Sequence, residues 1–164
     1  MRVVPDPPGP GQESVWDYPR PPRVEPSTAE VVVVLGGVEI CRTRRALRVL
    51  ETSHPPGWYL PVEDWVPGAL QPAAGSSFCE WKGAAAYLDV VGGDRRAPRA
   101  AWTYPDPTPA YEVLGGTVAV YPAAMDSCTV DGERVRPQEG GFYGGWITDD
   151  VVGPFKGPPG TLGW

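Results

Sequence analysis

The sequence has few of the residues that mark disulfide-stapled, metal-bound or membrane-embedded proteins. Only three cysteines occur, Cys41, Cys79 and Cys128, and they are widely spaced, so a disulfide framework is not expected. There is no CxxC or HxxxH pair, and a tetrahedral metal site would have to gather ligands from distant positions. The longest aliphatic run, residues 31–35, has five residues, whereas a membrane helix needs about 20. We therefore expect no metal site and no membrane partner.

Lysine is also scarce, and the chain is acidic. Lys82 and Lys156 are the only two lysines, and the net charge is −6. An acidic chain repels phosphate backbones, so nucleic acid is not an expected partner. The Gly-Gly pairs at residues 92–93 and 115–116 do not form a P-loop or a GxGxxG turn, so we expect no cofactor. The first residues lack the apolar region of a secretory signal, which together with free thiols predicts a cytoplasmic protein.

Proline and glycine are abundant instead, and they gather at the two ends. The chain has 22 prolines and 21 glycines among 164 residues. We predict a proline-rich arm over residues 1–22, extended rather than helical, and a folded domain over residues 23–138. Residues 139–164 are glycine-rich but carry several aromatic side chains, which disordered tails usually lack. We expect this tail to dock on the domain.

Short apolar segments separated by turn residues predict a mainly β domain. Residues 30–35 are β-branched and are followed by Gly36-Gly37, which favours a hairpin returning through residues 38–41. Residues 44–51 fit either a helix or a strand, and the surrounding pattern favours a strand. Further strands are expected at these segments: 57–61, 77–81, 84–90, 101–104, 117–121, 126–130 and 133–135. No long helical stripe occurs, so we expect a mainly antiparallel β domain with few short helical turns, one of them at residues 61–65.

Three polar residues are the candidates for chemistry. His54 is the only histidine, and histidine is the side chain that titrates near neutral pH. Glu51 lies three residues before it and could orient the ring. Lys82 occupies a glycine turn, where its charge could meet an anionic ligand. The alternatives are a histidine satisfied by backbone contacts and an ordinary turn lysine.

Tryptophan and tyrosine are more numerous than a core of this size needs. Seven of each occur, with only three phenylalanines. Both pair an apolar body with a polar tip, which suits the wall of a binding pocket. The candidate ligand-binding residues lie near proline or glycine turns: Trp58, Tyr59, Cys79, Trp81, Trp102, Tyr104 and Asp106. Packing under loops is the alternative for the aromatics, and burial without reactivity is the alternative for Cys79.

Four segments carry a resemblance to a known family. The runs RRALRVLETSHPPGWYLP, FCEWKGAAAY, AAWTYPDP and TVAVYPAAMDSCTVDGERV resemble the uncharacterised bacterial family called domain of unknown function 427, over about residues 22–136. The resemblance implies a β-tent-like fold of two small antiparallel sheets packed at an angle, similar to methionine sulfoxide reductase B and to the thalidomide-binding domain of cereblon. Those wider relatives carry paired CxxC zinc ligands, which this chain lacks, so the resemblance implies a metal-free version.

The sequence thus supports two hypotheses of function. The first is a site for an unidentified small molecule, with aromatic walls around Glu51, His54 and Lys82. If the site is catalytic, His54 acts as the general acid or base, Glu51 orients it and Lys82 stabilises developing negative charge. The second is a non-catalytic interaction module, with a possible homodimer formed through the terminal arms.

Overall fold

Antiparallel strands account for most of the ordered structure. The computed structural model describes residues 2–164, of which 45% are in strands and 9% in helices. All the helices are short 3-10 turns: η1 Val15–Asp17, η2 Val62–Asp64, η3 Pro109–Leu114 and η4 Pro122–Ala124. None of these turns is long and apolar enough to span a lipid bilayer. The prediction of a mainly β fold with few helical turns is confirmed.

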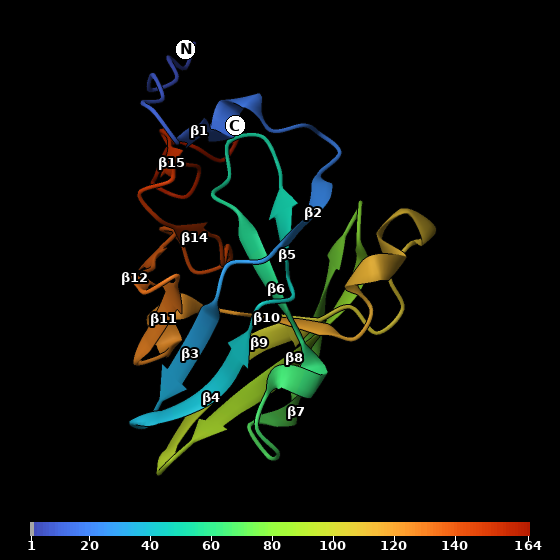
Figure 1. The fold of residues 1–164 in the computed structure, drawn as a ribbon. Helices are drawn as coiled ribbons and strands as arrows, with labels where there is room; N and C mark the ends of the chain where they lie inside the picture. Colours follow the sequence, from blue (N-terminus) through green and yellow to red (C-terminus); the bar gives the residue numbers. More distant parts are fainter. Residues whose placement is uncertain (1) are drawn as a thin grey trace.

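The largest unit is a seven-stranded antiparallel sheet that crosses the whole molecule (Figure 1). Its strands are arranged in the spatial order β2-β5-β6-β10-β9-β8-β7. Their bounds are β2 Arg23–Ser27, β5 Ala46–Leu50, β6 Gly57–Pro61, β10 Thr117–Val120, β9 Arg95–Thr103, β8 Gly83–Gly92 and β7 Leu70–Cys79. The ambiguous segment at residues 44–51 therefore contains a strand, as favoured.

A four-stranded antiparallel sheet packs against this one. Its order is β12-β11-β3-β4, with β3 Val31–Leu35, β4 Val38–Thr43, β11 Ser127–Val130 and β12 Glu133–Arg134. The β3–β4 hairpin turns at Gly36 and Gly37, whose φ angles of +62° and +73° are the positive values that a two-residue turn requires. The predicted hairpin is thus confirmed.

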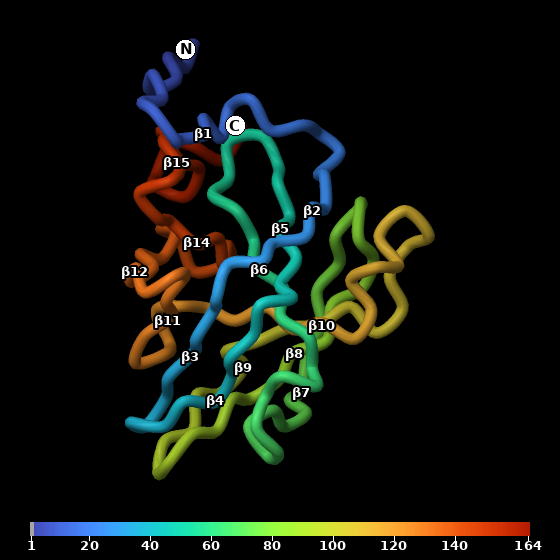
Figure 2. The backbone as a smooth tube through the Cα atoms, in the orientation of Figure 1, coloured from blue at the N-terminus to red at the C-terminus, as the bar shows by residue number. Residues whose placement is uncertain are grey.

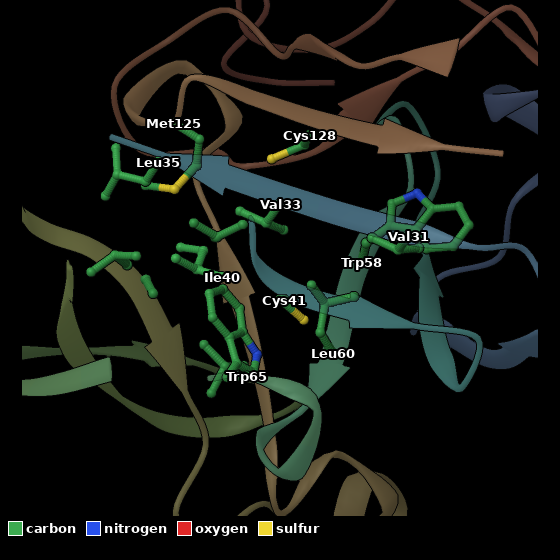
Figure 3. Packing of buried hydrophobic residues seen from close by; sticks show 14 of the residues in the cluster. Val31, Val33, Leu35, Ile40, Cys41, Trp58, Leu60, Trp65, Met125 and Cys128 are labelled. Atoms are coloured by element: carbon green, nitrogen blue, oxygen red, sulfur yellow. The ribbon is translucent and has the colours of Figure 1, made fainter. Parts of the chain in front are cut away.

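Side-chain alternation along the central strands creates two different faces. Trp58 and Leu60 on β6 face the four-stranded sheet, and with Val31 and Val33 they belong to the main core cluster (Figure 3). Tyr59 lies between them in sequence and faces the other way, in a second cluster with Tyr104, Tyr111 and Leu114. Successive residues of a strand point to opposite faces. The large sheet therefore has one face inside the core and one face with its own aromatic layer.

The two ends of the chain lie side by side (Figure 2). The strand β1 (Glu13–Ser14) pairs in parallel with β15 (Val151–Val152). The pair β13 (Arg136–Pro137) and β14 (Trp146–Ile147) forms the remaining small sheet. Trp16 contacts Trp164, with ring centroids 5.4 Å apart, and its Nε1–H donates to the carbonyl of Pro154 at 2.9 Å. The N-terminal arm and the C-terminal segment therefore hold one another.

Two strands are longer than their sequence signals, and one was not expected. β7 begins at Leu70 and β9 at Arg95, well before the segments expected at 77 and 101, and β2 (Arg23–Ser27) forms at the start of the domain, where no strand was predicted. Pro26 in β2 lies on an edge strand, where a missing backbone donor costs little. These extensions contain exposed polar and small residues without clear alternation, so their strand character comes from pairing with neighbouring strands.

Candidate functional site

A cleft of about 290 Å³ opens on the aromatic face of the seven-stranded sheet. The sheet contributes side chains from β5, β6, β8 and β9, and the tip of the β7–β8 hairpin forms one rim. The C-terminal segment closes another side with Gln138, residues 142–145 and Lys156. The volume lies at the lower end of the range for small-molecule sites.

The structure brings most of the predicted site residues to this one cleft. The three polar candidates, Glu51, His54 and Lys82, all line it. Five of the other candidates line it too: Tyr59, Cys79, Trp81, Trp102 and Tyr104. These residues come from stretches of chain separated by up to about a third of its length, so their meeting is a property of the fold and not of a local motif.

Two candidates, Trp58 and Asp106, do not line the cleft. Trp58 is 6% exposed and stacks on Trp146, with ring centroids 5.9 Å apart, because its position on β6 points to the core face (Figure 3). Asp106 is exposed in the loop after β9. Its proline neighbours keep that loop out of the sheet.

The loop that carries His54 is held from both sides. Ser53 adopts a φ of +72°, and its N–H donates to the carbonyl of Val15 at 3.1 Å, while its carbonyl accepts from the N–H of Lys156 at 2.8 Å. The His54 N–H donates to the carbonyl of Glu51 at 3.0 Å, which closes the turn. The loop is therefore braced by the N-terminal arm and the C-terminal segment together.

The side chain of His54 lies between Gln138 and Glu51. Gln138 Nε2 lies 3.3 Å from His54 Nδ1, and Gln138 Oε1 accepts from the N–H of Gly145 at 3.0 Å. Since the amide oxygen is engaged by a donor, the amide nitrogen faces the ring, and Nδ1 must accept. The proton of the neutral ring is then on Nε2, which lies 3.5 Å from Glu51 Oε2.

Burial keeps His54 neutral. Its side chain is 14% exposed, and loss of solvation, followed by the positive charges of Lys156, Arg20 and Lys82, lowers the pKa of His54 from 6.5 to about 4. An imidazolium would also lose the hydrogen bond that Nδ1 accepts. At neutral pH the ring is therefore a donor directed toward Glu51, whose other neighbour is Arg20 Nε at 3.4 Å.

Lys82 projects from the tip of the β7–β8 hairpin. The tip is fixed to the next loop, because Thr108 N–H donates to the Lys82 carbonyl at 3.1 Å and Thr108 Oγ1 donates to the carbonyl of Trp81. Gly83 has a φ of +106°, a value that favours glycine. Lys82 Nζ lies 5.6 Å from the centroid of the Tyr104 ring. Burial lowers the pKa of Lys82, but Tyr59, Cys79 and Glu51 together outweigh it, and the net shift is upward.

Aromatic side chains make up most of the wall between these polar groups. Trp102 Nε1–H donates to Tyr59 Oη at 3.2 Å, and the rings of Tyr59 and Tyr104 lie 6.2 Å apart. Trp102 also packs against Tyr121, with centroids 4.6 Å apart. The wall is therefore an interlocked layer whose polar tips are partly paired with one another.

The sequence interpretation missed the part of the cleft that the C-terminal segment supplies. His54 contacts Tyr143 edge to face, with ring centroids 5.0 Å apart. A Cβ atom on Gly144 would lie 2.3 Å from the Trp102 ring, and one on Gly145 would lie 2.7 Å from Pro55. The signal in the sequence was the pairing of glycines with aromatics in residues 140–146, since glycine permits close backbone approach.

Comparison with known proteins gives a family but no characterised relative. A family model described as "Domain of unknown function (DUF427)" matches residues 23–131. No curated protein matches the chain. The match includes the strands of the cleft and the loop of His54, but it ends before Gln138 and the rest of the C-terminal segment.

Proposed function

The chain belongs to the DUF427 family, and we propose that it is a small-molecule-binding domain whose ligand occupies the cleft. One observation carries the proposal. The only histidine, both lysines and an interlocked aromatic layer line a single cavity of about 290 Å³. A concave, largely aromatic site with a few convergent polar groups is the usual form of a small-molecule site.

The surroundings of His54 favour binding over acid–base turnover. A general base needs an unprotonated nitrogen facing the substrate near neutral pH. Here Nδ1 is occupied by Gln138 Nε2, and the lowered pKa of about 4 leaves little driving force to accept a proton. We therefore assign His54 a positioning role: its Nε2–H faces Glu51 and its ring supports Tyr143.

The alternative, an interaction module that uses the terminal arms, has less support. Trp16 is engaged by Trp164 and by the carbonyl of Pro154 in the same chain. Trp146 in the C-terminal segment is 1% exposed and belongs to the main core. These contacts hold the arms within the chain, but Phe142 and Leu162 are 62% and 84% exposed, so the interaction module stands as the second candidate. The homodimer and the cytoplasmic location remain predictions.

A thermal-shift screen of small metabolites tests the proposal. A ligand present at 100 times its Kd should add about 2.7 kcal/mol to the free energy of unfolding, which is readily detected as a rise in Tm. The shift should be lost in Trp81→Ala, which removes a cleft wall, and retained in Trp164→Ala, which removes an aromatic from the contact between the chain ends.

Two results would count against the cleft. One is a Tm shift that survives in Trp81→Ala with unchanged ligand affinity. The other is the absence of any ligand response together with a concentration-dependent increase in size that the double variant Trp16→Ala/Trp164→Ala abolishes, which would favour the interaction module. Sedimentation velocity measures that size.

A further inference from the structure

Both lysines of the chain line the cleft, and none of its twelve arginines does. Most arginines instead form ion pairs on the surface, such as Arg42 with Glu39 at 2.6 Å and Arg96 with Asp89 at 2.8 Å. Lysine presents a compact point charge on a flexible stem. The cleft therefore holds two ammonium groups beside the two carboxylates of Glu51 and Glu80, and its cations are lysines rather than the arginines of the surface.

Lys82 is the cleft lysine whose ammonium group has no partner. Within residues 2–164, its Nζ has no hydrogen bond and no carboxylate within 4.0 Å. Glu51 faces the same cleft but is engaged by Arg20 Nε at 3.4 Å and by His54. Lys156 Nζ, in contrast, donates to the main-chain oxygen of Trp164 at 3.3 Å. A half-buried ammonium without a partner is costly unless something supplies negative charge.

A cationic ligand would compete with the protein's own cations at three of the nine Phe, Tyr and Trp rings that line the cleft. The protein's own cations already lie over three of the tyrosines that line the cleft. Lys82 Nζ is 5.6 Å from the Tyr104 ring, Lys156 Nζ is 5.4 Å from the Tyr143 ring, and the Arg99 guanidinium is 4.6 Å from the Tyr87 ring. Cations are attracted to the faces of aromatic rings, and here that attraction is used internally.

Among residues 2–164, Lys82 is the charged donor of the cleft that has no acceptor. Burial raises the pKa of Tyr104 and raises the pKa of Tyr121 to about 12, so both phenols keep their protons at neutral pH, but Tyr121 Oη already donates to the carbonyl of Phe142 at 3.1 Å. Lys82 and Lys156 can only donate. The carboxylates that line the cleft are Glu51, which is paired, and Glu80, which is exposed on the hairpin turn. A complementary ligand is therefore rich in acceptors.

We propose that the ligand is a small planar carboxylate, an acid group attached to an aromatic or unsaturated ring, with its carboxylate on Lys82 Nζ and its ring against the aromatic layer. This inference rests on the proposed binding function and narrows it to one chemical class. The raised pKa of Lys82 keeps its amine charged, which suits ionic binding and disfavours covalent capture of a carbonyl compound.

Isosteric probes that differ only in charge test the inference. Benzoate, benzamide and benzamidinium share one ring and one planar substituent but carry charges of −1, 0 and +1. The naphthalene-2-carboxylate, -carboxamide and -carboxamidinium set repeats the comparison with two fused rings. Dissociation constants are measured by ligand-observed NMR with the full chain. We expect the acid of at least one set to bind about tenfold or more tightly than its amide, with the amidinium weakest.

Two substitutions then locate the acid group. Lys82→Met should lower the affinity for the acid to that for the amide and leave the amide unchanged within about twofold. Glu80→Gln, at the same hairpin, should leave acid binding unchanged or tighten it, because it removes a repelling charge. The Tm and the single histidine NMR signal of each variant verify that the fold and the cleft are intact.

The outcomes separate the inference from the function on which it rests. If the amide or the amidinium binds as tightly as the acid, the carboxylate class is overturned while small-molecule binding stands. If the preference for the acid survives in Lys82→Met, the proposed contact between the carboxylate and Lys82 is overturned. If no probe of either ring size binds, the inference is overturned, while the thermal-shift screen of metabolites alone decides the proposed function.

Discussion

The cleft has two walls that are built in different ways. The sheet wall consists of Val49, Tyr59, Tyr87 and Trp102 on β5, β6, β8 and β9, and hydrogen-bonded ladders on both sides fix its backbone. The tail wall consists of Gln138, residues 142–145 and Lys156. It is held by the side chain of Gln138, by close glycine contacts and by one deep anchor. A wall of the first kind follows from strand pairing, whereas the second kind depends on single residues.

The anchor of the tail wall should show the largest effect. Trp146 is 1% exposed, its N–H donates to the carbonyl of Pro56 at 2.8 Å, and its Nε1–H donates to the carbonyl of Val120 at 3.2 Å. Trp146→Ala should lower the free energy of unfolding by about 3–5 kcal/mol. Urea denaturation measures the change. Phe142→Ala, at a tail-wall residue that is 62% exposed, should change it by less than about 0.5 kcal/mol.

Equal effects of these two substitutions would contradict the distinction between the anchor and the rest of the tail wall. A loss of less than about 1 kcal/mol in Trp146→Ala would mean that the segment is a detachable cover and not part of the main core.

Lowering the pH should reduce the free energy of unfolding through protonation of His54, which lies where the two walls meet. The native protein binds a proton at His54 only near pH 4, because the pKa is lowered from 6.5 to about 4, while the unfolded chain binds it near pH 6.5. Stability that is present above pH 6.5 is therefore lost as the pH falls toward 4, by about 3 kcal/mol in total.

Urea denaturation at pH 7 and at pH 4.5 measures this loss. The same comparison on His54→Gln, which cannot titrate, gives the contribution of all other groups. An identical pH dependence in the two proteins would show that His54 is not held neutral in the native state.

A Gly→Ala substitution in the tail wall should lower the free energy of unfolding only where the glycine contacts the sheet wall. Gly144→Ala places a Cβ 2.3 Å from the Trp102 ring, whereas the Cβ of Gly141→Ala meets nothing within 4 Å. We expect Gly144→Ala to cost about 1–3 kcal/mol by overpacking and to change the fluorescence of Trp102, with little effect from Gly141→Ala. If the two substitutions cost the same, the glycine contact does not position the wall.

A charge at position 138 should change the protonation of His54 without disrupting the sheet wall. In Gln138→Glu one carboxylate oxygen can still accept from Gly145, while the other faces His54 Nδ1 and favours a proton there. The pKa of His54 should rise from about 4 toward its ordinary value, as measured by NMR titration of the single histidine. Gln71→Glu adds the same charge at a residue that does not line the cleft and should leave the titration unchanged.

Removal of the free ammonium should have the smallest effect on stability. Lys82→Met loses a contact with the Tyr104 ring but also relieves the burial of a charge, so we expect a change of less than about 1 kcal/mol. A loss of several kcal/mol, measured by urea denaturation, would assign Lys82 to the structure of the hairpin rather than to the cleft.

The sequence predicted the sheet wall well and the tail wall poorly, for physical reasons. In the sheet wall, the segments expected at residues 57–61 and 84–90 are found in β6 (Gly57–Pro61) and β8 (Gly83–Gly92), because short apolar runs between turn residues specify strands locally. His54 and Lys82 could be identified because histidine and lysine are rare in this chain, and Glu51 because it lies three residues before His54. The face of the sheet to which Trp58 points could not be predicted, because a shift of one residue in the register of a strand moves each side chain to the opposite face. The contacts of Gln138 and Gly144 join parts of the chain far apart in sequence, which no local pattern encodes.

The distribution of lysine has a practical consequence. Reagents that acylate or reductively methylate amines normally modify lysine side chains over the whole surface of a protein. In this chain the only side-chain amines are those of Lys82 and Lys156, and both lie in the cleft. Isotope-labelled methyl groups introduced in this way would give spectroscopic reporters at the candidate site without any substitution. Occupancy of the cleft by a ligand would be measured directly as protection of these amines from the reagent.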